Sequence, residues 1–155
     1  MNIKCTLESE GYRLLFSFEN IDNLREGVDF SAEFILDSSN YGLSVKSSTT
    51  FINFNDLQRL ITYFEEHITS LKKNPNSESD TFVTYGLKFQ IKALSGEVSD
   101  EMIGGGYFSI QCMVNAGTIL NKAGNTYVGG ESIITIENTY SFISSLNKAI
   151  ATLSN

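Results

Sequence analysis

Apolar and polar residues alternate along the first fifty residues of the chain, and this alternation predicts strands. Every second side chain of residues 12–19 is large and apolar: Tyr12, Leu14, Phe16 and Phe18. A period of two places these side chains on one face of a strand. Residues 2–9 and 12–19 flank Glu10-Gly11, so we expect a β-hairpin around this pair. Residues 28–37 repeat the pattern and predict a third strand, with a fourth expected over 43–51.

Two later segments have the period of an amphipathic helix. In the first, apolar residues recur at i, i+3, i+4, i+7, i+11 and i+14, as Leu57, Leu60, Ile61, Phe64, Ile68 and Leu71. Asn53 has the short polar side chain typical of an N-cap, and Pro75 blocks any continuation. We therefore predict a helix over about 53–73. A second helix, capped by Asn138, is predicted over about 138–153.

The clearest alternation in the chain lies between the two helices. Residues 83–93 carry apolar side chains at every odd position and polar or small ones between them, which predicts one continuous strand. Ser95-Gly96 then predicts a hairpin-like turn. A further strand is expected where Phe108, Ile110, Cys112 and Val114 alternate with more polar residues.

The end of the chain supplies the last elements of the predicted fold. A loop over 115–130, with a short strand at 118–120, leads to a last strand near 132–136. We therefore predict a single α+β domain over residues 1–155. In it a mostly antiparallel β-sheet is covered on one side by the two helices at about 53–73 and 138–153.

Composition favours a globular protein inside the cell. Apolar residues make up 41% and aromatic residues 12% of the chain, which is ample material for a core. No apolar run approaches the roughly 18 residues of a membrane span, and residues 1–10 lack the order of regions found in a signal peptide. We expect a cytoplasmic protein in which Cys5 and Cys112 are buried free thiols; a single bridge between them is the alternative.

The net charge of −7 narrows the choice of partner. Phosphate binding requires clustered Lys and Arg, whereas the eleven cations of this chain are dispersed, so we expect neither nucleic acid nor an anionic membrane as a partner. Acidic residues crowd one stretch in which Arg25 is the only cation: Glu19, Asp22, Glu26, Asp29, Glu33 and Asp37. This stretch is either a solubilising surface or a docking surface for a basic protein.

Candidates for catalysis have simpler structural interpretations. His67 is the only histidine and lies off the centre of the apolar stripe, so we expect a partly exposed surface side chain. The pair Asp100-Glu101 is interpreted as solvated surface. The glycines of 104–106 precede a strand, whereas a phosphate-binding loop opens a helix. We expect no catalytic residue, no bound metal and no cofactor, although the alternating aromatic residues leave a ligand cavity between sheet and helices as an alternative.

The order of these elements resembles that of a known family over about residues 28–153. Four segments carry the likeness: FNDLQRLITYFEEHITSL, TFVTYGLKFQIKALSGEVSDEM, YFSIQCMV and ENTYSFISSLNKAI. They resemble the WapI-like immunity proteins of bacterial polymorphic toxin systems, in which a Phe-x-x-Leu helix leads to a Leu-rich strand, a glycine turn and another strand. An Asp-Gln-Thr-Tyr-Leu segment then opens the last helix. Here that segment reads Glu-Asn-Thr-Tyr-Ser, and the loop over 115–130 is longer than the family's pattern.

This resemblance implies a cytosolic protein that binds and occludes a cognate toxin domain and performs no reaction itself. Many such toxins are basic nucleases, and the acidic charge of this chain is compatible with binding a basic protein. The contact residues are chosen by charge and expected exposure alone, and they are Asp22, Glu26, Asp29, Asp100 and Glu101. Two other functions remain open: a small-ligand-binding protein or enzyme with an aromatic-lined cavity, and a structural subunit with an apolar oligomer surface.

Overall fold

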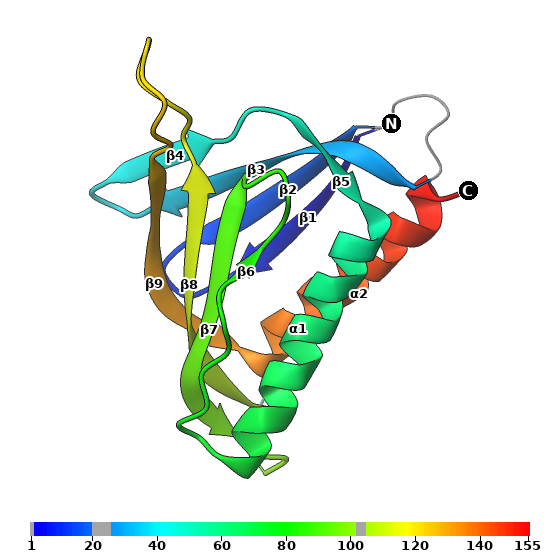
Figure 1. Ribbon diagram of the computed structural model, residues 1–155. Helices are drawn as coiled ribbons and strands as arrows, with labels where there is room; N and C mark the ends of the chain where they lie inside the picture. Colours follow the sequence, from blue (N-terminus) through cyan, green and yellow to red (C-terminus); the bar gives the residue numbers. More distant parts are fainter. Residues whose placement is uncertain (1, 20–25, 102–104) are drawn as a thin grey trace.

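The computed structural model describes residues 2–19, 26–101 and 105–155, and in these ranges the predicted α+β class is confirmed (Figure 1). The described residues form two antiparallel sheets and two helices. The strands divide between a five-stranded and a four-stranded sheet. Alternation along single strands does not reveal this division, because it identifies a buried face without identifying neighbours.

The five-stranded sheet follows the predicted hairpin closely. Its elements are β1 (Asn2–Glu8), β2 (Arg13–Glu19), β3 (Gly27–Asp37), β4 (Gly42–Lys46) and β5 (Thr50–Asn53). The order is β1-β2-β3-β4, and β5 also pairs with β3. The expected strand over 43–51 is thus divided in two, because the chain leaves the edge of β3 between β4 and β5. Ser47 bridges that step, accepting from the Ala32 N–H with its Oγ (3.0 Å) while its own N–H donates to the Ala32 carbonyl (2.8 Å).

Helix α1 (Phe54–Lys73) is placed as predicted. The Asn53 side chain accepts from the Asn55 N–H at 2.7 Å, which satisfies one of the free amides of the first turn. The predicted apolar stripe is buried along the whole helix. Asn74 caps the C-terminal end through its N–H, and Pro75 follows.

The four-stranded sheet corrects the interpretation of residues 83–98. Its strands are β6 (Phe82–Val83), β7 (Phe89–Val98), β8 (Gly106–Asn115) and β9 (Tyr127–Thr135), in the order β6-β7-β8-β9. The expected continuous strand over 83–93 is wrong: the chain reverses over residues 84–88, and β6 pairs antiparallel with β7 through Phe82 and Ile91. The turn expected at Ser95-Gly96 is also wrong, because β7 continues through a bulge after Ala93 to Val98.

The last elements begin earlier than expected. Strand β9 starts at Tyr127, and residues 118–120 form no strand. Helix α2 (Ile136–Leu153) is capped by Thr135, whose Oγ1 accepts from the Asn138 N–H at 3.0 Å. Asn138 is therefore no cap. Its side-chain amide instead donates to the Glu8 carbonyl at 3.2 Å, which ties the first turn of α2 to the end of β1.

One aromatic core joins the two sheets and the helices. Figure 1 shows α1 and α2 side by side along one side of the molecule, and their main contacts are with each other, with β7 and with β1. The Phe16 ring of β2 lies 4.7 Å from the Phe89 ring of β7 and 5.8 Å from the Phe142 ring of α2, measured between centroids. All three side chains are fully buried, so this cluster fixes how the layers meet.

Candidate functional site

The alternating aromatic side chains form core. Tyr12 and Phe34 lie with ring centroids 4.8 Å apart, and Phe16 and Phe30 with centroids 5.9 Å apart. The Tyr12 hydroxyl donates to the Ile110 carbonyl of the other sheet at 2.9 Å. Burial raises the pKa of this phenol above its ordinary value. These rings pack against one another, and none of them lines the surface groove described below.

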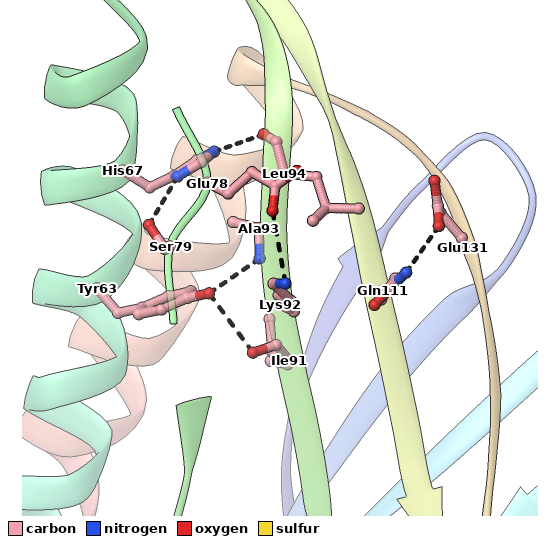
Figure 2. Close-up of polar contacts among 10 residues, drawn as sticks. All are labelled: Tyr63, His67, Glu78, Ser79, Ile91, Lys92, Ala93, Leu94, Gln111 and Glu131. Carbon is pink, nitrogen blue, oxygen red and sulfur yellow. Dashed lines mark hydrogen bonds and ion pairs between the residues drawn. The ribbon is translucent and has the colours of Figure 1, made fainter. Parts of the chain in front are cut away.

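His67 is buried, which corrects the expectation of a surface side chain. Only 1% of its area is exposed. Figure 2 shows the ring between two partners: Nδ1 lies 2.8 Å from the Ser79 Oγ, and Nε2 lies 2.9 Å from the Leu94 carbonyl. A carbonyl can only accept, so Nε2 carries the proton and Nδ1 accepts from the Ser79 hydroxyl. Burial lowers the pKa of His67, and the neutral imidazole has a structural role.

Tyr63, one turn before His67, contacts the same edge of β7 (Figure 2). Its hydroxyl accepts from the Ala93 N–H at 2.9 Å and lies 3.5 Å from the Ile91 carbonyl. Strand β6 pairs with only two residues of β7, so it leaves later backbone groups of that edge without a strand partner. Side chains of α1 take over this pairing.

A surface groove lies between the C-terminal half of α1 and helix α2, along which its lining extends from Ile136 to Lys148. It has a volume of about 780 Å³. Its charged lining residues are Lys72 of α1, Glu137 and Lys148 of α2, and Asp100 after β7. Two cations and two carboxylates balance one another. The groove therefore shows no preference for an anionic or a cationic ligand.

The five acidic residues predicted as contacts do not form one group. Asp22 lies outside the described residues. Glu26 lies at the start of α1, where its carbonyl accepts from the Phe54 N–H at 2.9 Å, and Asp29 lies near it in β3. Asp100 shares the groove with Lys72 at the other end of α1, next to the exposed Glu101. A helix of 20 residues is about 30 Å long, so two separate acidic groups result.

Strand pairing adds two residues to the group at the start of α1. Glu19 of β2 lies directly opposite Asp29 of β3, which lies opposite Phe51 of β5. These three side chains share the sheet face away from the core, and Phe51 is 44% exposed. We call Glu19, Glu26, Asp29 and Phe51 the acidic row. Glu19 and Phe51 could not be placed from sequence, because nothing there shows which strands pair.

Gly27 fixes the aromatic side chain of the acidic row. A Cβ at this position would come within 2.4 Å of the Phe51 ring and within 2.3 Å of the Ile52 carbonyl. The ring therefore lies closely over the backbone of Gly27, between Glu26 and Val28. Phe51 is thus an exposed aromatic side chain held in one place beside carboxylates.

The two thiols are free and buried, as predicted. Burial raises the pKa of Cys112 to about 12 and raises the pKa of Cys5 above its ordinary value. Both thiols are therefore protonated at neutral pH, and neither has the environment of a nucleophile.

Across 2–19, 26–101 and 105–155, no group of three or more His, Cys, Asp or Glu side chains lies together as a set of metal ligands. In the same ranges, neither helix combines the length and apolar character needed to cross a bilayer.

Comparison with known proteins finds no family model and no curated relative that matches this chain. The resemblance to WapI-like immunity proteins therefore rests on the four sequence segments and their order. The geometry of the acidic row does not depend on that resemblance.

Proposed function

We propose that the chain is a protein-binding module of the cytoplasm: an immunity protein that binds and occludes a cognate toxin domain and catalyses no reaction. The partner is a basic protein, and the acidic row is the surface that meets it. The resemblance of the four sequence segments suggests the biological role. The acidic row suggests the charge of the partner.

The observation that carries this proposal is the placement of Glu19 opposite Asp29. Like charges directly opposite each other on neighbouring strands destabilise a sheet. The two ion pairs found among the described residues, Arg59–Asp56 and Lys92–Glu78, involve neither carboxylate. A Lys or Arg from a partner would relieve this repulsion.

Phe51 adds a second reason to expect a basic partner at this place. Its exposed ring lies beside Asp29 in the row. The face of an aromatic ring attracts ammonium and guanidinium groups, and it also supplies apolar contact area. A cationic side chain placed here meets a carboxylate and an aromatic face together.

The test uses the toxic domain expected from the reading frame next to this one in the source genome. Expressed alone, that domain should arrest bacterial growth, and co-expression of this chain should restore growth. The purified proteins should form a one-to-one complex in size-exclusion chromatography. If no complex forms and growth is not restored, the proposed function is wrong.

Charge reversal then tests the acidic row. Glu26→Lys with Asp29→Lys should lower the association rate at least about 10-fold at low salt and should weaken its salt dependence. The matched control is Asp100→Lys with Glu101→Lys, which makes the same change of net charge at the other end of α1. Equal effects of the two variants would mean that net charge matters and the acidic row does not.

The same variant carries an internal check on folding. Asp29→Lys replaces a like-charged pair with Glu19 by an oppositely charged pair. The free energy of unfolding should therefore stay the same or rise by about 0.2–1 kcal/mol, as measured by urea denaturation. Slower association together with undiminished stability would show that the row serves binding at the expense of the fold. A loss of stability would contradict this interpretation of the row.

A further inference from the structure

Two turns at one end of the four-stranded sheet expose large apolar side chains. Residues 84–88 connect β6 to β7, and residues 116–126 connect β8 to β9. The exposed fractions are 101% for Tyr85, 85% for Leu120, 73% for Ile119 and 43% for Leu87. Figure 1 shows the segment between β8 and β9 extending well beyond both sheets. We call these two segments the apolar turns.

The segment between β8 and β9 is an ordered hairpin. Beyond the last paired strand residues, the Ala116 N–H donates to the Thr126 carbonyl at 2.8 Å, and the Thr126 N–H donates to the Gly117 carbonyl at 2.9 Å. Gly117 has a φ of 91°, a conformation that suits glycine. The β8–β9 ladder therefore continues into the connecting segment.

The tip of this hairpin is a turn that presents Ile119 and Leu120 to solvent. The Lys122 N–H donates to the Ile119 carbonyl at 2.9 Å, which closes the turn. Asn121 has a φ of 63°, a left-handed conformation that asparagine tolerates better than most residues. The two apolar side chains are thus held out by hydrogen-bonded backbone, which lowers the entropy lost on binding.

The other turn holds a strained residue at the base of the hairpin. Leu87 has a φ of 51°, which is unfavourable for a residue with a branched side chain. Its carbonyl accepts from the Asn115 Nδ2 at 3.0 Å and from the Tyr127 hydroxyl at 3.1 Å. Asn115 ends β8 and Tyr127 starts β9, so the base of the hairpin holds Leu87 in this conformation. Backbone strain of this kind is concentrated at functional sites.

The charge of this region is opposite to that of the whole protein. Residues 81–96 and 105–130 contain Lys88, Lys92 and Lys122 and no Asp or Glu, although the chain carries a net charge of −7. Lys92 is paired with Glu78, while the Lys88 Nζ donates to the Ser48 Oγ at 2.7 Å. Lys122 lies at the hairpin tip, where its backbone N–H closes the turn.

We propose that the apolar turns are the anchor of the complex: the hairpin tip inserts into an apolar hollow of the protein partner, and carboxylates on the rim of that hollow meet Lys122 and Lys88. This inference rests on the proposed function and names the element that occludes the toxin domain. A projecting apolar tip requires a concave apolar surface on the other protein. The acidic row speeds the encounter, and the tip makes the complex long-lived.

A membrane is the less fitting partner for this tip. Each lysine near an anionic bilayer contributes only about 1 kcal/mol of attraction, and here two lysines belong to a protein with a net charge of −7. The rest of the molecule is therefore repelled by the surface that the tip would enter.

The test compares variants in binding to the toxin domain of the neighbouring reading frame. Ile119→Ser with Leu120→Ser should raise Kd at least about 30-fold, mainly through faster dissociation. The matched control is Tyr140→Ser on α2, which removes another exposed apolar side chain and should leave Kd within about twofold. Lys122→Glu should lower the association rate, because it brings a carboxylate to the carboxylates of the rim. Circular dichroism melting curves of all variants should coincide with that of the wild type.

The outcomes separate this inference from the proposed function. If the wild type binds and the Ile119→Ser/Leu120→Ser variant binds equally well, the anchor is wrong and the proposed function stands. If the wild type does not bind the domain at all, the proposed function fails and the anchor fails with it. Vesicles of phosphatidylserine and phosphatidylcholine provide the last arm. Sedimentation of the wild type with these vesicles, lost in the variant, would assign the tip to a membrane and overturn the inference.

Discussion

At the scale of single residues, His67 is held in one protonation state by its surroundings. Its ring stacks edge-on against Phe108 with centroids 4.8 Å apart, and both nitrogens have hydrogen-bond partners. A second proton on the ring would have to replace the hydrogen bond that Nδ1 accepts from Ser79. Desolvation by burial disfavours that charge as well, which is why the pKa of His67 is lowered.

This lowered pKa predicts how stability changes with pH. An unfolded histidine takes up a proton near pH 6.5, whereas folded His67 resists protonation until the pH is lower. Protons therefore bind preferentially to the unfolded chain, and the free energy of unfolding decreases as the pH falls below about 6.5. His67→Gln keeps a donor and an acceptor but cannot titrate. It should cost about 1–2 kcal/mol at neutral pH, and this cost should shrink toward pH 5.

Urea denaturation of both proteins across this pH range measures the difference. Carboxylates titrate alike in the two proteins, so their contribution cancels. A cost of the His67→Gln substitution that grows as the pH falls would contradict the assigned protonation state.

At the scale of elements, α1 serves as a partner for the edge of β7. Strand β6 covers two residues of that edge, and Tyr63 and His67 reach the backbone beyond it. The connector before β6 adds two backbone bonds, from the Ser79 N–H to the Ala93 carbonyl and from the Gly96 N–H to the Pro75 carbonyl. The edge of the sheet is therefore closed to other strands along this stretch.

Removing the Tyr63 hydroxyl should show how much the pairing at this edge contributes to stability. Tyr63→Phe leaves the N–H of the fully buried Ala93 without an acceptor. We expect the free energy of unfolding to fall by about 1–2 kcal/mol and the Ala93 amide to exchange faster with solvent. Tyr140→Phe, which removes an exposed hydroxyl, is the control and should change stability by less than about 0.5 kcal/mol. Equal stability of the two variants would mean that water reaches the Ala93 amide.

Periodicity predicted the elements whose signals are local. The stripe and cap of α1 and the hairpin of β1 and β2 depend on residues close in sequence, and each is confirmed. The turn over 84–88 was missed because Tyr85 and Leu87 continue the alternation through it. Leu87 adopts a conformation usually reserved for glycine, so the chain carries little turn signal there. His67 was misplaced because its partners Ser79 and Leu94 come near it only through folding.

At the scale of the whole molecule, the composition indicated an acidic surface but could not locate it. Glu26 and Asp100 both belong to acidic stretches of the sequence, yet α1 separates them by most of its length. Glu19 and Phe51 join Asp29 only through the pairing of three strands. The apolar turns could not be recognised from the sequence, because the sequence does not show that their four large apolar side chains are exposed.

Both thiols are buried, so the rate at which they react should measure how often the core opens. Cys5 lies in β1 and Cys112 in β8, both within the aromatic core. Their reaction with a disulfide reagent should be slower than in denaturant by a factor on the order of a thousand or more, because the core must open first. Ellman's reagent with and without urea measures both rates. Rapid reaction of one thiol in the native protein would reveal local opening of its strand.

The positions of the two chain ends decide how this protein can be tethered. Strand β1 begins and α2 ends on the same side of the molecule, whereas the hairpin between β8 and β9 extends from a different side (Figure 1). A surface or bead attached through either terminus would leave the hairpin facing the bulk solution. The same attachment would place the matrix near Glu19 of the acidic row, because Glu19 lies opposite Asn2 at the start of β1. A sensor chip would then slow electrostatic encounter and leave dissociation unaffected.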